Sequence, residues 1–132
     1  MKKFVILSMF FISFLYADIK IIASSLCKVE TLSIYDAKNL FMVKKRSIDN
    51  EPIIIIDNSN NEIYNIFIKK YLKKSSRKMK VYWTRMLFTG KKMPPKKLSQ
   101  EELLSLDTNK SCYLSYMEED NKPINWNIIK IK

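Results

Sequence analysis

The stretch PIIIIDNSNNE, residues 52–62, does most to decide the fold. Its four isoleucines, Ile53 to Ile56, form a continuous apolar run directly after Pro52. A continuous rather than alternating run is typical of a strand that is covered on both faces in a mostly parallel sheet. A helix should follow at once, because Ser59 and Glu62 have the spacing of a capping box.

Strands and helices alternate on both sides of this stretch. Further β-rich segments occupy residues 19–23, 112–116 and 125–132. Serines in helix-capping positions are Ser33, Ser75 or Ser76, and Ser99. Gly90, the single glycine, stands where the end of a helix needs a left-handed residue. The alternation predicts an α/β layer fold with a mixed, mostly parallel sheet flanked by helices, which residues 125–132 close or border.

Residues 1–17 have the pattern of a cleavable secretory signal peptide. Lys2 and Lys3 precede an apolar run, which ends at the small residue Ala17. That run is shorter than the roughly 20 apolar residues that a membrane-spanning helix needs, although an uncleaved N-terminal anchor is the alternative. We expect residues 18–132 to form one domain in the periplasm, with no stable membrane insertion after cleavage.

The chain is strongly basic, with 24 Lys and Arg against 13 Asp and Glu and a net charge of +11. Such a charge favours anionic partners, such as phosphorylated ligands, lipid headgroups or cell-surface polymers, although solubility alone also accounts for it. The lysine clusters at residues 69–74 and 91–97 contain no glycine and one aromatic residue, Tyr71, so they do not have the repeated glycines and aromatic residues of a nucleic-acid platform. Nucleic acid is therefore not an expected partner.

Several catalytic chemistries are excluded by composition. The chain has no histidine, so it cannot build a Ser-His-Asp or Cys-His arrangement or the usual zinc sites. With one glycine it has no glycine-rich phosphate loop. We expect a binding protein and not an enzyme, with no catalytic residues, no cofactor and no metal.

The two cysteines, Cys27 and Cys112, permit one long-range disulfide in an oxidising compartment. Two buried free thiols fit the sequence equally well. A redox enzyme is not expected, because the chain has no Cys-x-x-Cys pair.

The turn at residues 57–60 is the candidate anion site. It lies between a buried strand and a helix N-terminus, where free N–H groups and the helix dipole favour an oxyanion. Ser59 and Asn60 offer side-chain donors, and Arg85 offers a forked one. The alternatives are that Ser59 is a plain helix cap and that Arg85 is an exposed helical residue. Asp57 would repel an anion unless it faces away.

The stretch VYWTRMLFTGKKMPP, residues 81–95, gives the chain a family resemblance. It resembles the small single-lobe proteins related to the substrate-binding component of bacterial phosphate ABC transporters, in the type 2 periplasmic-binding-protein superfamily. The resemblance covers nearly all of residues 19–132. Its other motifs are Leu32, Ser33, Phe41, Lys44 and Lys45, then Ile53 to Asp57, Phe67, and SCYLSY at residues 111–116.

The resemblance implies one lobe of a type 2 periplasmic-binding-protein-like fold. It also implies a periplasmic solute-binding role, in which phosphate or another small oxyanion is held for a membrane transporter or sensor. The family's Ser-Gly-Thr phosphate turn is replaced by residues 58–60, of which Ser59 carries over. Asn60, Arg85 and the loop at Ser24 and Ser25 complete the predicted ligand-binding set. The alternative is a non-catalytic, basic envelope protein-interaction module with a vestigial ligand site. The oligomeric state stays open.

Overall fold

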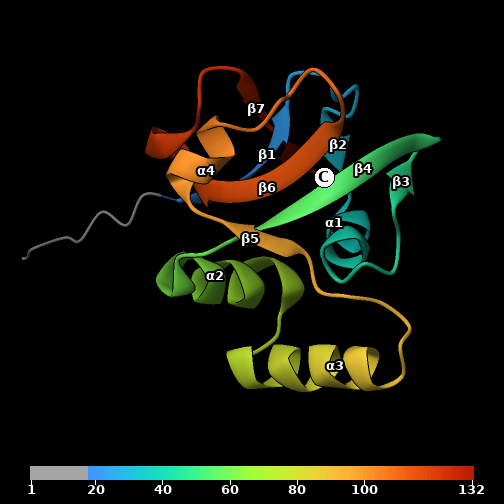
Figure 1. The fold of residues 1–132 in the computed structure, drawn as a ribbon. Coiled ribbons are helices and arrows are strands. Elements are labelled where there is room, and N and C mark those ends of the chain that lie inside the picture. Colours follow the sequence, from blue (N-terminus) through green and yellow to red (C-terminus); the bar gives the residue numbers. More distant parts are fainter. Residues whose placement is uncertain (1–17) are drawn as a thin grey trace, which may run out of the picture.

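The computed structural model describes residues 18–132 (Figure 1). The predicted signal peptide, residues 1–17, lies outside the described residues. The elements follow in the order β1 (Ile19–Ser24), β2 (Thr31–Leu32), α1 (Ile34–Phe41), β3 (Ser47–Ile48), β4 (Glu51–Asn58), α2 (Asn61–Phe67), the π-helical turn η1 (Ile68–Leu72), α3 (Ser76–Phe88), β5 (Lys96–Leu98), α4 (Gln100–Leu104), β6 (Cys112–Glu118), the 3₁₀ turn η2 (Glu119–Asn121), β7 (Trp126–Ile128) and β8 (Lys130–Ile131). None of these helices has the length and apolar character needed to cross a membrane.

The main sheet is mixed, with strand order β3-β4-β6-β1-β7 and with β5 paired to the end of β4 (Figure 1). β4 runs parallel to β5 and β6, as the intervening helices predict. β1 lies antiparallel between β6 and β7, and β3 is antiparallel to β4. The prediction of a mostly parallel sheet is therefore wrong. Helical crossovers decide the direction of β4, β5 and β6, but no crossover decides the direction of β1.

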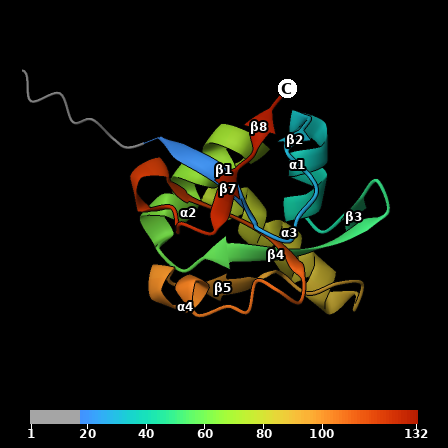
Figure 2. The same cartoon turned by 90° about the horizontal axis from the view of Figure 1, so that it is seen from above.

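The two faces of the sheet carry apolar cores of unequal size. The larger core lies under α1, α2, η1 and α3, and the rings of Phe67 and Tyr116 stack at its centre, 3.6 Å apart. The smaller core lies on the opposite face under α4 and includes Leu103 and Trp126. Figure 2 shows α4 across the sheet from α1 and α2. The domain is therefore layered, as the α/β pattern predicts.

β4 is covered on both faces only near its end. Ile53 packs into the larger core and Ile56 into the smaller one, but Ile54 is 44% exposed. The prediction of a fully covered strand is therefore correct for only part of β4. The smaller core, which α4 covers, contains Ile56 and no other residue of β4.

Serine caps begin three of the helices, as predicted. Ser33, Ser75 and Ser99 each accept a hydrogen bond from the third N–H of the helix that follows. At α3 the helix ends before Gly90, whose φ of +64° is the left-handed conformation expected there.

α2 begins differently from the prediction. Its cap is Asn60, whose Oδ1 accepts hydrogen bonds from the N–H groups of Glu62 and Ile63 at 3.0 and 3.2 Å. Ser59 instead donates its backbone N–H to the carbonyl oxygen of Leu98, and so continues the pairing of β4 with β5. The capping role assigned to Ser59 is thus wrong. The pairing of β4 with β5 continues past the isoleucine run to the backbone of Ser59, so the helix begins one residue later than predicted.

Cys27 and Cys112 form a disulfide, which decides between the two alternatives that the sequence allows. The bond joins the loop after β1 to the first residue of β6, across 85 residues of chain. The Glu51 carboxylate accepts hydrogen bonds from the N–H groups of Lys28 and Val29 in the same loop. The start of β4 and the start of β6 are therefore both tied to the loop that follows β1.

Breaking this disulfide should lower stability substantially. Because the closed loop is long, the chain-entropy argument gives a loss of about 4 kcal/mol for C27A/C112A or for the reduced protein. Urea unfolding with and without a reductant measures the loss. The matched control is C27A/C112A itself, on which the reductant should have no effect. Equal stability of the oxidised and reduced wild type would contradict this account.

Candidate functional site

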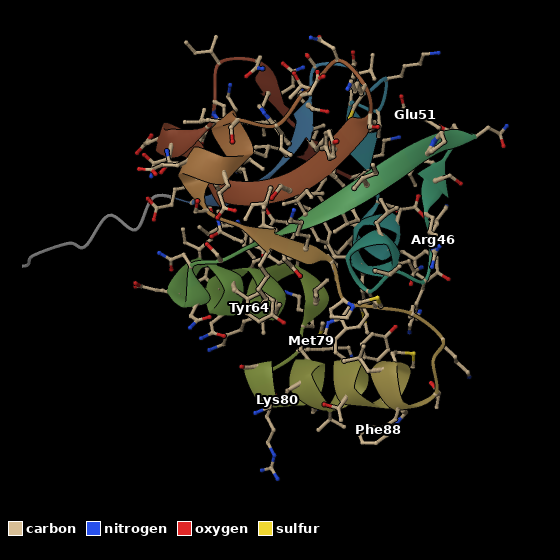
Figure 3. All side chains as sticks on the ribbon, in the orientation of Figure 1. Arg46, Glu51, Tyr64, Met79, Lys80 and Phe88 are labelled. Atoms are coloured by element: carbon tan, nitrogen blue, oxygen red, sulfur yellow. A yellow bond between two sulfur atoms is a disulfide. The ribbon has the colours of Figure 1, made fainter. Side chains whose placement is uncertain are left out.

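A cleft of about 470 Å³ opens between α2, α3 and β5. Its charged lining consists of Asp57, Lys80 and Lys97, and its neutral polar lining of Asn61, Tyr64, Asn65, Ser76 and Thr84. Trp83, Leu87 and Pro94 form the apolar part of the wall. In Figure 3, Tyr64 extends from α2 on the side that faces α3, and Lys80 belongs to the first half of α3.

The position of the cleft follows from the strand order. Asp57 is the last residue but one of β4, and it pairs with Lys97 in the parallel ladder between β4 and β5. In α/β sheets, ligands bind outside the carboxyl ends of the parallel strands, because the loops there converge. Asp57 and Lys97 lie near the carboxyl ends of β4 and β5, and the cleft extends from them between α2 and α3. The residues directly at the carboxyl ends of β4, β5 and β6 line a second hollow.

Asp57 is a buried carboxylate that is only 6% exposed. The Tyr116 hydroxyl donates a hydrogen bond to its Oδ1 at 2.8 Å and accepts one from the N–H of Asn58 at 3.2 Å. Within the described chain, no other hydrogen bond to the Asp57 carboxylate is formed. Burial raises the pKa of Asp57 from its usual 3.8 to about 6, although the Tyr116 hydrogen bond and the charge of Lys97 act in the opposite direction.

The two tyrosines near Asp57 stay protonated. Burial, and then the charge of Asp57, raise the pKa of Tyr64 to about 12. The same two causes raise the pKa of Tyr116 well above its usual range. Both phenol groups are therefore hydrogen-bond donors at any physiological pH.

Two lysines supply positive charge to the cleft. The Lys97 ammonium lies 4.4 Å from the centroid of the Tyr64 ring, a cation–π arrangement. Lys80, an exposed residue of α3, lines both this cleft and the outer depression of the helix. The ion pairs found among residues 18–132 involve neither lysine and do not involve Asp57. These charges are therefore available to a ligand.

The combination of groups suits one class of ligand. Two ammonium groups and several neutral polar side chains attract an oxyanion, whereas the ionised Asp57 accepts a hydrogen bond and repels a bare oxygen. An oxyanion that carries a proton satisfies both requirements. Among the described residues, no group of three or more His, Cys, Asp and Glu side chains is arranged to hold a metal ion.

The structure brings together only part of the site predicted from the sequence. Ser59 and Asn60 line a separate hollow of about 310 Å³, together with Ser99 and Glu118. The side-chain oxygen of Asn60 is already used in capping α2. The carboxylate of Glu118 also faces this hollow and disfavours an anion there.

The other predicted residues lie elsewhere. Ser24 is buried at the end of β1, and its hydroxyl accepts a hydrogen bond from the N–H of Tyr113 at 2.9 Å. Since β1 is antiparallel to β6, Ser24 and the exposed Ser25 lie at the end of the sheet where β4 begins, far from Ser59. Arg85 lies in a shallow outer depression of α3 and not in the cleft.

Sequence reasoning missed Lys80 and Lys97 and treated Asp57 only as an obstacle. One signal was available, because Asp57 directly follows the isoleucine run and so had to stand at the carboxyl end of a strand. The pairing of Asp57 with Lys97 had no such signal. β5 has three residues and begins after two prolines, and neither feature predicts a strand.

A comparison with protein-family models finds no match, and a comparison with curated proteins finds none either. Among solved structures, the chain is similar to a protein from Ruminococcus gnavus ATCC 29149 that is provisionally described as peptide-binding. The identity is 17%, the similarity covers 85% of this chain and 92% of that chain, and the TM-score is 0.33. So distant a similarity carries no argument about the ligand. The fold and cleft define a mixed α/β domain with a polar ligand-sized cleft.

Replacing Asp57 by asparagine should stabilise the protein at high pH. The folded state raises the pKa of Asp57. The ionised carboxylate therefore destabilises the folded state above about pH 6. Below about pH 4 the carboxyl group is protonated, and this destabilisation is absent. We expect D57N, which keeps an acceptor for Tyr116, to be more stable than wild type by up to about 3 kcal/mol at pH 8 and equally stable at pH 4.

Urea unfolding at the two pH values measures the difference. Asp120→Asn removes an exposed carboxylate and should leave stability unchanged at both. A D57N effect of the same size at pH 4 and pH 8 would refute the buried charge as its cause.

Proposed function

We propose that this chain is a periplasmic solute-binding-like domain that holds a small, proton-carrying oxyanion, with phosphate as the first candidate. The observation that carries the proposal is the buried Asp57 carboxylate, which lines the same cleft as Lys80 and Lys97, beside the parallel ladder of β4 and β5. The resemblance of residues 81–95 to proteins related to phosphate-transporter components supports the same class of ligand.

Three charged groups would contact the ligand, each in a different role. The ammonium groups of Lys80 and Lys97 offset the negative charge of the ligand, and the Tyr116 hydroxyl holds the Asp57 carboxylate by its Oδ1. The other carboxylate oxygen is then free to accept a hydrogen bond from the ligand. Hydrogen phosphate offers that proton near neutral pH, and sulfate does not. Asp57 would therefore reject sulfate, since two unprotonated oxygens would face each other in a partly desolvated site.

The biological setting of this proposal rests on the sequence. An exported domain that holds an oxyanion reversibly would present it to a membrane transporter or sensor. The proposed role is binding without catalysis, in which the lysines of the cleft hold the anion and Asp57 accepts its proton.

Discrimination between phosphate and sulfate tests the proposal. By isothermal titration calorimetry at pH 8, we expect phosphate to bind at least about tenfold more tightly than sulfate, a difference of about 1.4 kcal/mol. D57N should abolish that preference, because its amide can donate to either anion. Lys97→Gln should weaken both anions, and K110Q should weaken neither, because Lys110 is exposed outside the cleft.

The pH dependence provides a second criterion. As the pH falls below about 6, Asp57 becomes protonated and can donate to any oxyanion, so sulfate should bind more tightly at pH 5 than at pH 8. The proposal fails if neither anion binds in the millimolar range, or if D57N leaves the ratio of the two affinities unchanged.

A further inference from the structure

The charges of this chain are strongly segregated. Residues 63–100 contain 12 Lys and Arg and no Asp or Glu. The rest of the described chain, residues 18–62 and 101–132, contains 10 Lys and Arg and 13 Asp and Glu. The basic segment runs from the middle of α2 through η1 and α3 to β5. The excess positive charge of the domain is thus carried by one continuous segment of the chain.

α3 is the outermost element of that segment. In Figure 1 it lies beyond α2, on the side away from the sheet. It is attached by one face, through the buried Met79 and Trp83 and through the Tyr82 hydroxyl, which donates to the carbonyl oxygen of Met42 at 2.8 Å. The opposite face of α3 is left without a partner along most of its 13 residues, a length of about 20 Å.

The outer face of α3 combines apolar and basic side chains. Val81 is 52% exposed and Phe88, seven residues further along the same face, is 89% exposed. Arg77 and Arg85 flank them and line the same shallow depression. Figure 3 shows Phe88 on the side of α3 that faces away from the rest of the molecule. None of the ion pairs in residues 18–132 involves either arginine.

We propose that the outer face of α3 docks on an anionic phospholipid surface. Helices that lie at a membrane surface present apolar side chains, with aromatic residues among them, within a band of Lys and Arg. The apolar pair Val81 and Phe88 lies within such a band. The band follows the whole length of α3 and lacks any acidic residue, so it matches an extended sheet of negative charge rather than one acidic group of a protein.

The docking surface adjoins the cleft, because Lys80 and Thr84 line both the outer depression and the cleft. Arg77, Val81, Arg85 and Phe88 do not line the cleft around Asp57. Docking through α3 would hold the cleft-bearing layer at the membrane, so a bound solute would stay beside the lipid surface. This inference stands whether or not the cleft binds phosphate.

Sedimentation with vesicles tests the docking surface. The full chain is mixed with vesicles of equal parts phosphatidylglycerol and phosphatidylcholine, or with vesicles of phosphatidylcholine alone. Every protein compared carries the same residues 1–17, so only differences between lipids and between variants count. We expect binding to the anionic vesicles, weakened by salt, and at least about tenfold weaker binding to phosphatidylcholine.

Two variants locate the contact on α3. R77Q/R85Q and F88S should each weaken binding to anionic vesicles about tenfold or more, with no change in urea unfolding. The matched control K110Q/K130Q removes the same charge from exposed positions outside α3 and should keep wild-type binding. Equal binding to the two vesicle types, an unchanged affinity of R77Q/R85Q, or an equal loss in K110Q/K130Q would each overturn the proposal. Stable, folded wild type that binds no anionic vesicle would overturn it as well.

Discussion

The hydrogen bond from the Tyr116 hydroxyl to the Asp57 carboxylate connects the core of this domain to its cleft. Tyr116 is fully buried and stacks on Phe67, so the aromatic core sets the position of the hydroxyl. In the described chain this is the one hydrogen bond to the buried Asp57 carboxylate. The raised pKa of Asp57 reflects the free-energy cost of burying its charge. A buried charge with one hydrogen bond lowers the stability of the fold, and a binding role is a physical reason for an aspartate at this position.

Much of the fold is predictable from the sequence, because local chemistry decides it. The serine caps of α1, α3 and α4 and the left-handed Gly90 act within one turn of chain. The direction of β1 is different. It depends on pairings such as that of Ile19 with Glu118, which are almost a hundred residues apart and leave no periodic signal. The disulfide has the same character, since strand order brings Cys27 to Cys112.

The candidate site was only half predictable for a related reason. The isoleucine run places the Asp57 turn at the end of a strand, but it does not say which side chains are spent on local structure. Asn60 uses its Oδ1 to cap α2, and Ser59 uses its backbone N–H to extend the sheet, so local structure holds both residues beside a different hollow. The cationic partners come from β5 and α3, and only the three-dimensional pairing brings Lys97 beside Asp57. The basic side chains of the chain thus form two groups. One group lines the cleft, and the other faces outward on α3.

The most direct test of this account is the carboxyl ¹³C resonance of Asp57, followed by NMR across pH and then with each anion at pH 8. We expect a midpoint near pH 6 in the free protein, and at pH 8 a larger change of the resonance on addition of phosphate than of the same concentration of sulfate. An Asp57 that titrates near pH 4 and responds to neither anion would contradict both the buried charge and the proposed ligand.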